Sequence, residues 1–152
     1  MEKKYTIECN EKQLRLIAQA LEMYSRAICG QIEESFSPPI HDELWKHYDR
    51  SEGADNSEYY KKRKEVDEHL LAVKKIIWDC GPAASKGVGY DPTADLGYEM
   101  YKEILHQFEI EDKEECEKSG KEYYWNVHSG KPCLKFTNEP VIKISVFDNI
   151  KK

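Results

Sequence analysis

The segment from Asn10 to Glu34 would be apolar around more than half of its circumference if it formed one helix. At about 100° per residue, one apolar stripe runs along it. The stripe consists of Leu14, Ile17, Ala18, Leu21, Tyr24, Ile28 and Ile32, and it is widened by Leu16, Ala20, Met23 and Ala27. A small monomeric domain rarely has to cover so wide a face. The pattern predicts a helix at the centre of a layered domain or in a homo-oligomer interface, with the four widening residues at the contact.

The polar side of this segment is narrow, and Gly30 leaves a gap in it where another group could approach. Arg26 lies on this side between Glu22 and Glu33. If Arg26 is buried, it needs a carboxylate or phosphate partner. One interpretation is an ion pair with Glu22 or Glu33, or a dimer contact, and the other is contact with a ligand.

Length and composition predict one domain, covering residues 1–152, because a chain of this size can bury most of its unfolded surface. The net charge of −6 argues against a protein that binds duplex nucleic acid through its phosphates. The sequence has no apolar run long enough to cross a membrane and no apolar leader, so we expect a cytoplasmic protein. Five dispersed cysteines suggest free thiols.

The local patterns predict an α+β fold, with three main helices packed on a small antiparallel sheet formed by the N-terminal strand and the C-terminal strands. Alternating residues predict strands at 4–9 and 141–147, and a hairpin at 123–136. Asn10 and Gln13 form a capping-box pattern, and Ser37-Pro38-Pro39 predicts the end of the first helix. Further elements are expected as a short helical piece at 42–48, helices at 57–80 and 92–108, and a charged connection at 111–121.

A loop rich in small residues, 83–90, lies between the second and third main helices. Its glycines could let backbone amides approach a phosphate or carboxylate, although it lacks the P-loop pattern. The candidate ligand-binding residues in it are Ser85, Lys86, Gly87 and Tyr90, where Lys86 suits an anion and Tyr90 a flat ring. Trp125 and His128 could stack on a ring in the same way. The alternatives are an ordinary helix connection and ordinary packing in a strand.

No catalytic or metal-binding signature is evident. Cys133 and His128 are the one thiol and imidazole close enough in sequence to suggest a nucleophile and its base, and Cys116 could join them in a metal site. The CxxC spacing is absent, and a fourth ligand is missing. We therefore expect no catalytic residues, no metal and no cofactor.

The run Tyr24-Ser25-Arg26-Ala27-Ile28-Cys29-Gly30-Gln31-Ile32-Glu33-Glu34 resembles the YSRxxxGQxEE pattern in the N-terminal helix of an uncharacterised family of small bacteriophage-encoded proteins. Weaker similarities are found at 85–88, 98–106 and 141–144. The resemblance implies a viral origin and no established activity.

Small phage proteins without catalytic residues often counter host immunity, and this association suggests two functions. The first is a non-enzymatic homo-oligomer that sequesters a nucleotide-type immune signal in the host cytosol. The nucleotide would be held between subunits at the 83–90 loop, with amides and Lys86 on the phosphate and an aromatic ring on the base. The alternative is an inhibitor or adaptor that binds a host protein without a small ligand. A nucleotide-degrading enzyme is a third interpretation.

Overall fold

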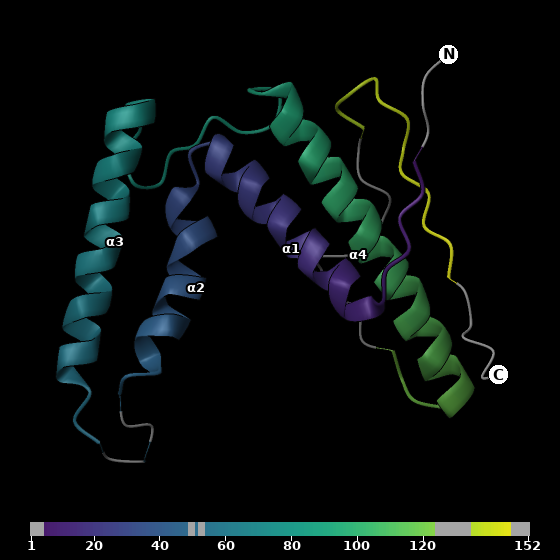
Figure 1. The fold of residues 1–152 in the computed structure, drawn as a ribbon, viewed down its shortest axis with the longest axis horizontal. Helices are drawn as coiled ribbons and strands as arrows, with labels where there is room; N and C mark the ends of the chain where they lie inside the picture. Colours follow the sequence, from purple (N-terminus) through teal and green to yellow (C-terminus); the bar gives the residue numbers. More distant parts are fainter. Residues whose placement is uncertain (1–4, 49–50, 52–53, 124–134, 147–152) are drawn as a thin grey trace. The chain divides into compact units, whose positions relative to one another are not determined.

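The computed structural model describes residues 5–48, 51, 54–123 and 135–146. These residues form four helices and no strand (Figure 1). The helices are α1 (Glu11–Ile28), α2 (Ile32–Trp45), α3 (Ser57–Trp78) and α4 (Pro92–Ser119). The predicted α+β fold is therefore wrong for the described part of the chain, which is all-helical.

The two expected strands fail for different reasons. Residues 5–9 have no ladder partner, and the apolar side chains that should have been buried are exposed, with Tyr5 at 83% and Ile7 at 78%. In 141–146 the alternation correctly predicted the orientation of Ile142 and Ile144, which pack against the core while Lys143 is exposed. It was wrong for Val146, which was expected to point inward and is 59% exposed. This segment lies against helices rather than against another strand. Most of the expected hairpin, 124–134, lies outside the described residues.

The chain divides into two compact units, described separately below. A terminal unit combines residues 1–21 with 96–152, and a central unit comprises Glu22–Asp95. The division falls within α1 and within α4.

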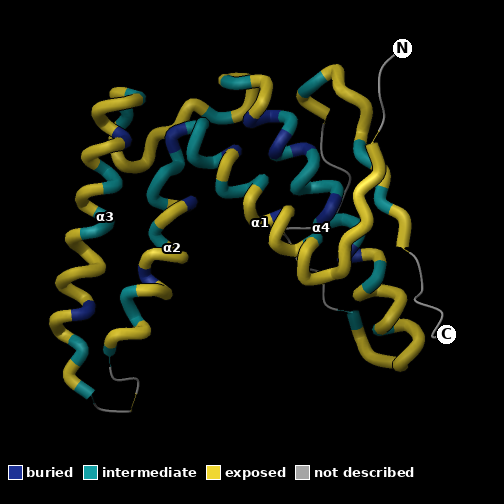
Figure 2. The backbone as a smooth tube through the Cα atoms, in the orientation of Figure 1, coloured by how far each residue is buried: buried dark blue, intermediate teal, exposed yellow. Residues whose placement is uncertain are grey.

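The terminal unit has a small apolar core between α1 and α4. Ala18, Ile104 and Phe108 are buried at its centre, with Ile104 only 1% exposed. Partly buried apolar side chains surround them: Leu14, Leu21, Tyr101, Leu105, Ile142 and Ile144. Figure 2 shows buried positions in α4 as dark blue segments. One side of the predicted α1 stripe is thus buried as expected.

In residues 135–146, here called the C-terminal strap, the hydrogen bonds to α4 converge on the Glu99 carboxylate. Glu99 accepts hydrogen bonds from the backbone amides of Phe136 and Thr137, and from the Thr137 hydroxyl at 2.8 Å. Burial of the Glu99 carboxyl opposes ionisation. The hydrogen bonds from Thr137 and Phe136, together with nearby Lys135, outweigh that cost and lower the pKa of Glu99 from its usual value.

Two helix starts follow the sequence closely. The Asn10 amide donates to Gln13 Oε1 and the Gln13 amide to Asn10 Oδ1, both at 2.9 Å, which confirms the capping box. Asp91 Oδ1 accepts from the amides of Thr93 and Ala94 at 2.9 and 2.8 Å, ahead of Pro92 at the first helical position.

The helix ends differ from the expectation. The break occurs at Gly30 rather than at Pro38-Pro39, and both prolines lie inside α2. Pro38 and Pro39 are exposed, and their fixed φ suits a helix even though two amide donors are lost. The expected connection at 111–121 is mostly helical, since α4 continues to Ser119 and ends at Gly120, where φ is +67°. None of the helices in the described segments has the length and apolarity needed to cross a membrane.

The Glu99 contacts predict a pH dependence. Because the pKa of Glu99 is lower in the folded state than in the unfolded state, its hydrogen bonds to the strap contribute their full stability above the unfolded-state pKa, 4.5. This stability is lost as the pH falls through the folded-state pKa of Glu99. We expect Glu99→Gln to lower the unfolding free energy by about 1–3 kcal/mol at neutral pH. Urea unfolding across the acid range should show a smaller loss of stability in Glu99→Gln than in the wild type. Equal acid slopes for the two proteins would contradict this role.

Candidate functional site

The turn between α1 and α2 is built around Gly30. The Gln31 amide donates to Arg26 O at 2.8 Å and the Gly30 amide to Ala27 O at 3.0 Å, the two bonds of a Schellman motif. Gly30 has φ +80°, and a Cβ there would lie 3.3 Å from the Trp78 ring. A side chain at this position would therefore face both an unfavourable backbone conformation and a close neighbour.

The end of α3 and the loop that follows it pack around this turn. Trp78 Nε1 donates to Ile28 O at 3.0 Å, and the Lys86 amide donates to Cys29 O at 2.9 Å. The Cys29 thiol donates to Gly87 O at 3.3 Å. Burial, followed by the negative charges of Asp95 and Asp91, raises the pKa of Cys29 above its usual value. A thiol held protonated in this way is a poor nucleophile.

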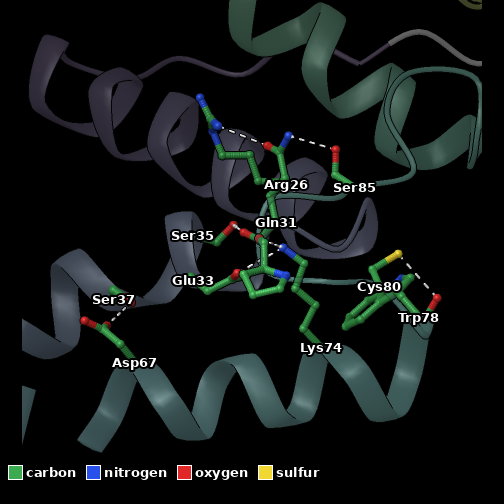
Figure 3. A network of polar contacts seen from close by, with 11 residues as sticks. Arg26, Gln31, Glu33, Ser35, Ser37, Asp67, Lys74, Trp78, Cys80 and Ser85 are labelled. Carbon is green, nitrogen blue, oxygen red and sulfur yellow. Dashed lines mark hydrogen bonds and ion pairs between the residues drawn. The ribbon is translucent and has the colours of Figure 1, made fainter. Parts of the chain in front are cut away.

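A polar network joins two of the predicted ligand-binding residues (Figure 3). Arg26 donates to Gln31 Oε1 at 3.0 Å. It also donates to Glu22 Oε1 at 2.9 Å. Gln31 Nε2 in turn donates to Ser85 Oγ at 3.3 Å. Arg26 and Ser85, which are far apart in sequence, are therefore brought together through Gln31, a residue that the sequence interpretation had not assigned to the site.

The rest of the 83–90 loop is less suited to an anion than its glycines suggested. The Lys86 amide is already bonded to Cys29 O, and the Gly89 amide donates to both carboxylate oxygens of Asp95, at 3.0 and 3.1 Å. The Asp95 carboxylate thus already accepts the hydrogen bond that the Gly89 amide could have donated to a bound anion. The side chain of Lys86 is exposed, Gly87 is partly buried and Tyr90 is 51% exposed. Their contact with a ligand stays a prediction.

A buried lysine connects three parts of the central unit. Lys74, only 1% exposed, donates from Nζ to Glu33 Oε1 at 2.9 Å and to Pro82 O at 2.7 Å (Figure 3). It therefore ties α3 to α2 and to the loop after α3. Of the two carboxylates considered for Arg26, Glu22 binds it, whereas Glu33 is paired with Lys74. In the sequence, the sign that Lys74 points inward is its position four residues before Trp78, on the same helical face.

The seam between α2 and α3 contains further polar contacts. The Ser37 hydroxyl donates to Asp67 Oδ1 at 2.7 Å. His41 Nε2 lies 3.0 Å from the same oxygen, without the alignment of a hydrogen bond. An aromatic contact follows at the far end, where the rings of Trp45 and Tyr59 have centroids 4.2 Å apart. The order of these contacts shows that α2 and α3 run antiparallel, as Figure 1 also shows.

Four exposed apolar residues flank this polar seam, and we call them the hairpin face. Each directly precedes a residue that contacts the opposite helix or the α1–α2 turn, namely Ser37, His41, Lys74 or Trp78. In antiparallel helices, one step back turns toward the same side of the pair. The hairpin face consists of Phe36 (37% exposed), Ile40 (38%), Val73 (39%) and Ile77 (61%).

The predicted oligomer contact is partly exposed. Leu16 is 65% exposed and Ala20 is also exposed, while Met23 and Ala27 are half-buried. The chain therefore covers Met23 and Ala27 more than it covers Leu16 and Ala20. Homo-oligomer formation through them stays a prediction.

Several of the other candidates cannot be placed. Trp125, His128 and Cys133 lie outside the described residues. Among the residues that are described, no group of three or more His, Cys, Asp or Glu side chains could hold a metal ion.

Comparisons of the chain with protein-family models, with curated proteins and with solved structures found no match.

The Lys74 contacts predict a strong coupling between two residues. Removing one partner of a buried ion pair leaves an uncompensated charge, so Lys74→Met and Glu33→Leu should each lower the unfolding free energy by about 3–5 kcal/mol. The double variant should recover much of this loss, because both charges are then absent. Denaturant unfolding in a double-mutant cycle measures the coupling, and additive losses would show that the pair is energetically unimportant.

Proposed function

We propose that this protein is a non-catalytic inhibitor or adaptor that binds another protein through the hairpin face. The observation that supports this is the position of polar and apolar side chains in the α2–α3 hairpin. Ser35 and His41 are buried in α2, and Tyr59 and Lys74 in α3, while Phe36, Ile40, Val73 and Ile77 remain exposed.

This distribution is unusual energetically. Burying an apolar side chain stabilises a protein by about 1.5–3 kcal/mol, whereas a buried polar group needs a partner to avoid a penalty. In the hairpin, polar groups occupy several of the inward positions and bond one another there, beside half-buried apolar side chains, whereas the four residues of the hairpin face lie in contact with solvent. We take these exposed apolar residues as the interaction surface, because large apolar side chains left in solvent are what a protein partner covers.

The resemblance of residues 24–34 to small phage proteins suggests where the partner would be found. A phage-encoded protein acts in the bacterial cytosol, so the proposed partner is a host protein. Interference with host defence follows only from this association.

Two matched variants test the use of the hairpin face. Val73→Ser with Ile77→Ser removes apolar contacts from the face, whereas Ile76→Ser alters a neighbouring residue that is 82% exposed on another side of α3. Losing the apolar contacts of the face should weaken partner binding by about 5–30-fold, which corresponds to roughly 1–2 kcal/mol of contact energy. Crosslinked complexes from host lysate, quantified by mass spectrometry, measure the difference.

The control should retain the partner and the wild-type melting temperature, because Ile76 is 82% exposed. The face variant should be less stable, since Val73 is only 39% exposed, and its capture is measured at a temperature where circular dichroism shows it folded. A partner that is captured equally by the face variant and the wild type would refute binding through this surface.

A second candidate function is sequestration of a phosphorylated nucleotide signal. The supporting observation is that Arg26 and Ser85 meet through Gln31, with the exposed Lys86 next in sequence. Against it, Glu22 already neutralises Arg26, and Asp95 occupies the Gly89 amide. Any ligand phosphate would have to displace Glu22 from the guanidinium.

A ligand panel separates the candidates. The purified protein is incubated with cyclic nucleotides, washed and denatured, and the released compounds are identified. Sequestration predicts intact nucleotide from the wild type and from Arg15→Ala, whose side chain pairs with Glu11 on α1, and at least a tenfold loss in Arg26→Ala. Altered nucleotide would indicate an enzyme. No uptake would contradict sequestration and leave a protein partner.

A further inference from the structure

We propose that His41 makes the attachment of the second half of α2 to α3 depend on pH. When both ring nitrogens carry a proton, His41 pairs with Asp67 and holds residues 40–45 of α2 against α3. When one proton is lost, the contact weakens and this part of α2 separates from α3 more often. The proposal goes beyond the proposed function and does not depend on it, because it concerns the stability of the hairpin itself.

The contact between His41 and Asp67 is poor when the imidazole is neutral. His41 is only 9% exposed, and its Nε2 atom is buried without a hydrogen-bond partner although Asp67 Oδ1 lies 3.0 Å away. In the tautomer with its proton on Nδ1, lone pairs of nitrogen and oxygen would face each other, and in the other tautomer the N–H is poorly aligned with the oxygen. A positive ring attracts the carboxylate whatever the alignment. The geometry therefore favours the protonated form.

The opposing effect is the cost of burying a charge. This cost is limited at the His41–Asp67 contact, because the side chain of Asp67 is 38% exposed and keeps part of its hydration. The Ser37 hydroxyl also donates to Asp67 Oδ1 at 2.7 Å, which stabilises the carboxylate in its ionised form (Figure 3). The protonated ring thus has an ionised partner at the edge of the seam.

The other charged groups on the facing surfaces of α2 and α3 are paired or exposed. On α3, which packs against α2, Arg63 and Lys74 share the helix face of Asp67, one turn before it and two turns after it. Arg63 is exposed, and the charge of Lys74 is compensated by Glu33. The titratable residues that follow His41 along the chain are exposed, namely Asp42, Glu43, Lys46 and His47. Asp67 is therefore the group that acts most strongly on the charge of His41.

Two prolines make this part of α2 depend on its contacts with α3. Pro38 and Pro39 lie inside α2 and have no amide hydrogen, so two helical hydrogen bonds are missing just before His41. Residues 40–45 are therefore joined to the first half of the helix by fewer backbone bonds. Their contacts with α3 include the His41–Asp67 pair and the ring contact at the far end of the hairpin. Weakening the first of these contacts should loosen the segment.

Hydrogen exchange of the full protein, followed by NMR at pH 6 and pH 8, tests the proposal. Histidine side chains gain or lose their proton in this range. The docked hairpin binds the proton more tightly than the open one, so its stability is complete at the lower pH and is lost as the pH rises. The protection factors of the amides in residues 40–45, which correct for the intrinsic pH dependence of exchange, should be about tenfold lower at pH 8, the effect of one contact with a charged group.

Four variants separate His41 from the other histidines. Asp67→Asn keeps an acceptor for Ser37 but removes the charge, so it should abolish the difference between pH 6 and pH 8, as should His41→Gln. The controls are His47→Gln and His69→Gln, because both side chains are exposed, His69 at 78%. The controls should keep the tenfold difference.

Equal protection of the wild type at the two pH values, or higher protection at pH 8, would overturn the proposal. A difference that persists in Asp67→Asn, or that disappears in either control, would overturn it as well. If the buried position of His41 prevents His41→Gln from folding, Asp67→Asn still decides the question, because it leaves the histidine in place.

Discussion

The central unit depends on one buried charge. Lys74 is almost completely removed from solvent, and such a group is tolerated only because Glu33 and the Pro82 carbonyl accept its hydrogen bonds. These acceptors come from α2 and from the loop after α3, so a single ammonium group fixes the register of the hairpin and the start of that loop. The loop in turn reaches the α1–α2 turn through Lys86, Cys29 and Gly87.

Fixing a hairpin through polar contacts has a consequence for its surface. Directional bonds at Glu33, Ser37 and Asp67 specify one arrangement of α2 and α3, but they contribute less net stability than apolar packing would. The apolar residues one position away are then left available for another molecule. In the terminal unit the opposite arrangement holds, because Ile104 and Phe108 form an apolar core and the charged Glu99 fastens only the C-terminal strap.

The candidate ligand site was partly predictable. Arg26 was expected to need a carboxylate or phosphate partner if buried, and Glu22, at the favourable i, i+4 spacing, provides a carboxylate. Glycines in the 83–90 loop suggested free amides, but sequence could not reveal that Asp95 folds back onto Gly89 or that Cys29 O accepts from Lys86. Gln31, which connects Arg26 to Ser85, carried no local signal, because its role depends on a contact between residues 54 positions apart.

The sequence by itself determined the features that depend on neighbouring residues. These are the capping box at Asn10, the start of α4 at Asp91-Pro92 and the inward alternation of Ile142 and Ile144. Only the tertiary structure decided where the first helix ends and what the extended segments pair with. Trp78 packs against Gly30 and accommodates the turn there, while Glu99 binds the strap amides that a neighbouring strand was expected to bind. The physical reason is range: caps and alternation arise within a few residues, whereas the partner of a buried charge or a backbone amide is chosen by parts of the chain far apart in sequence.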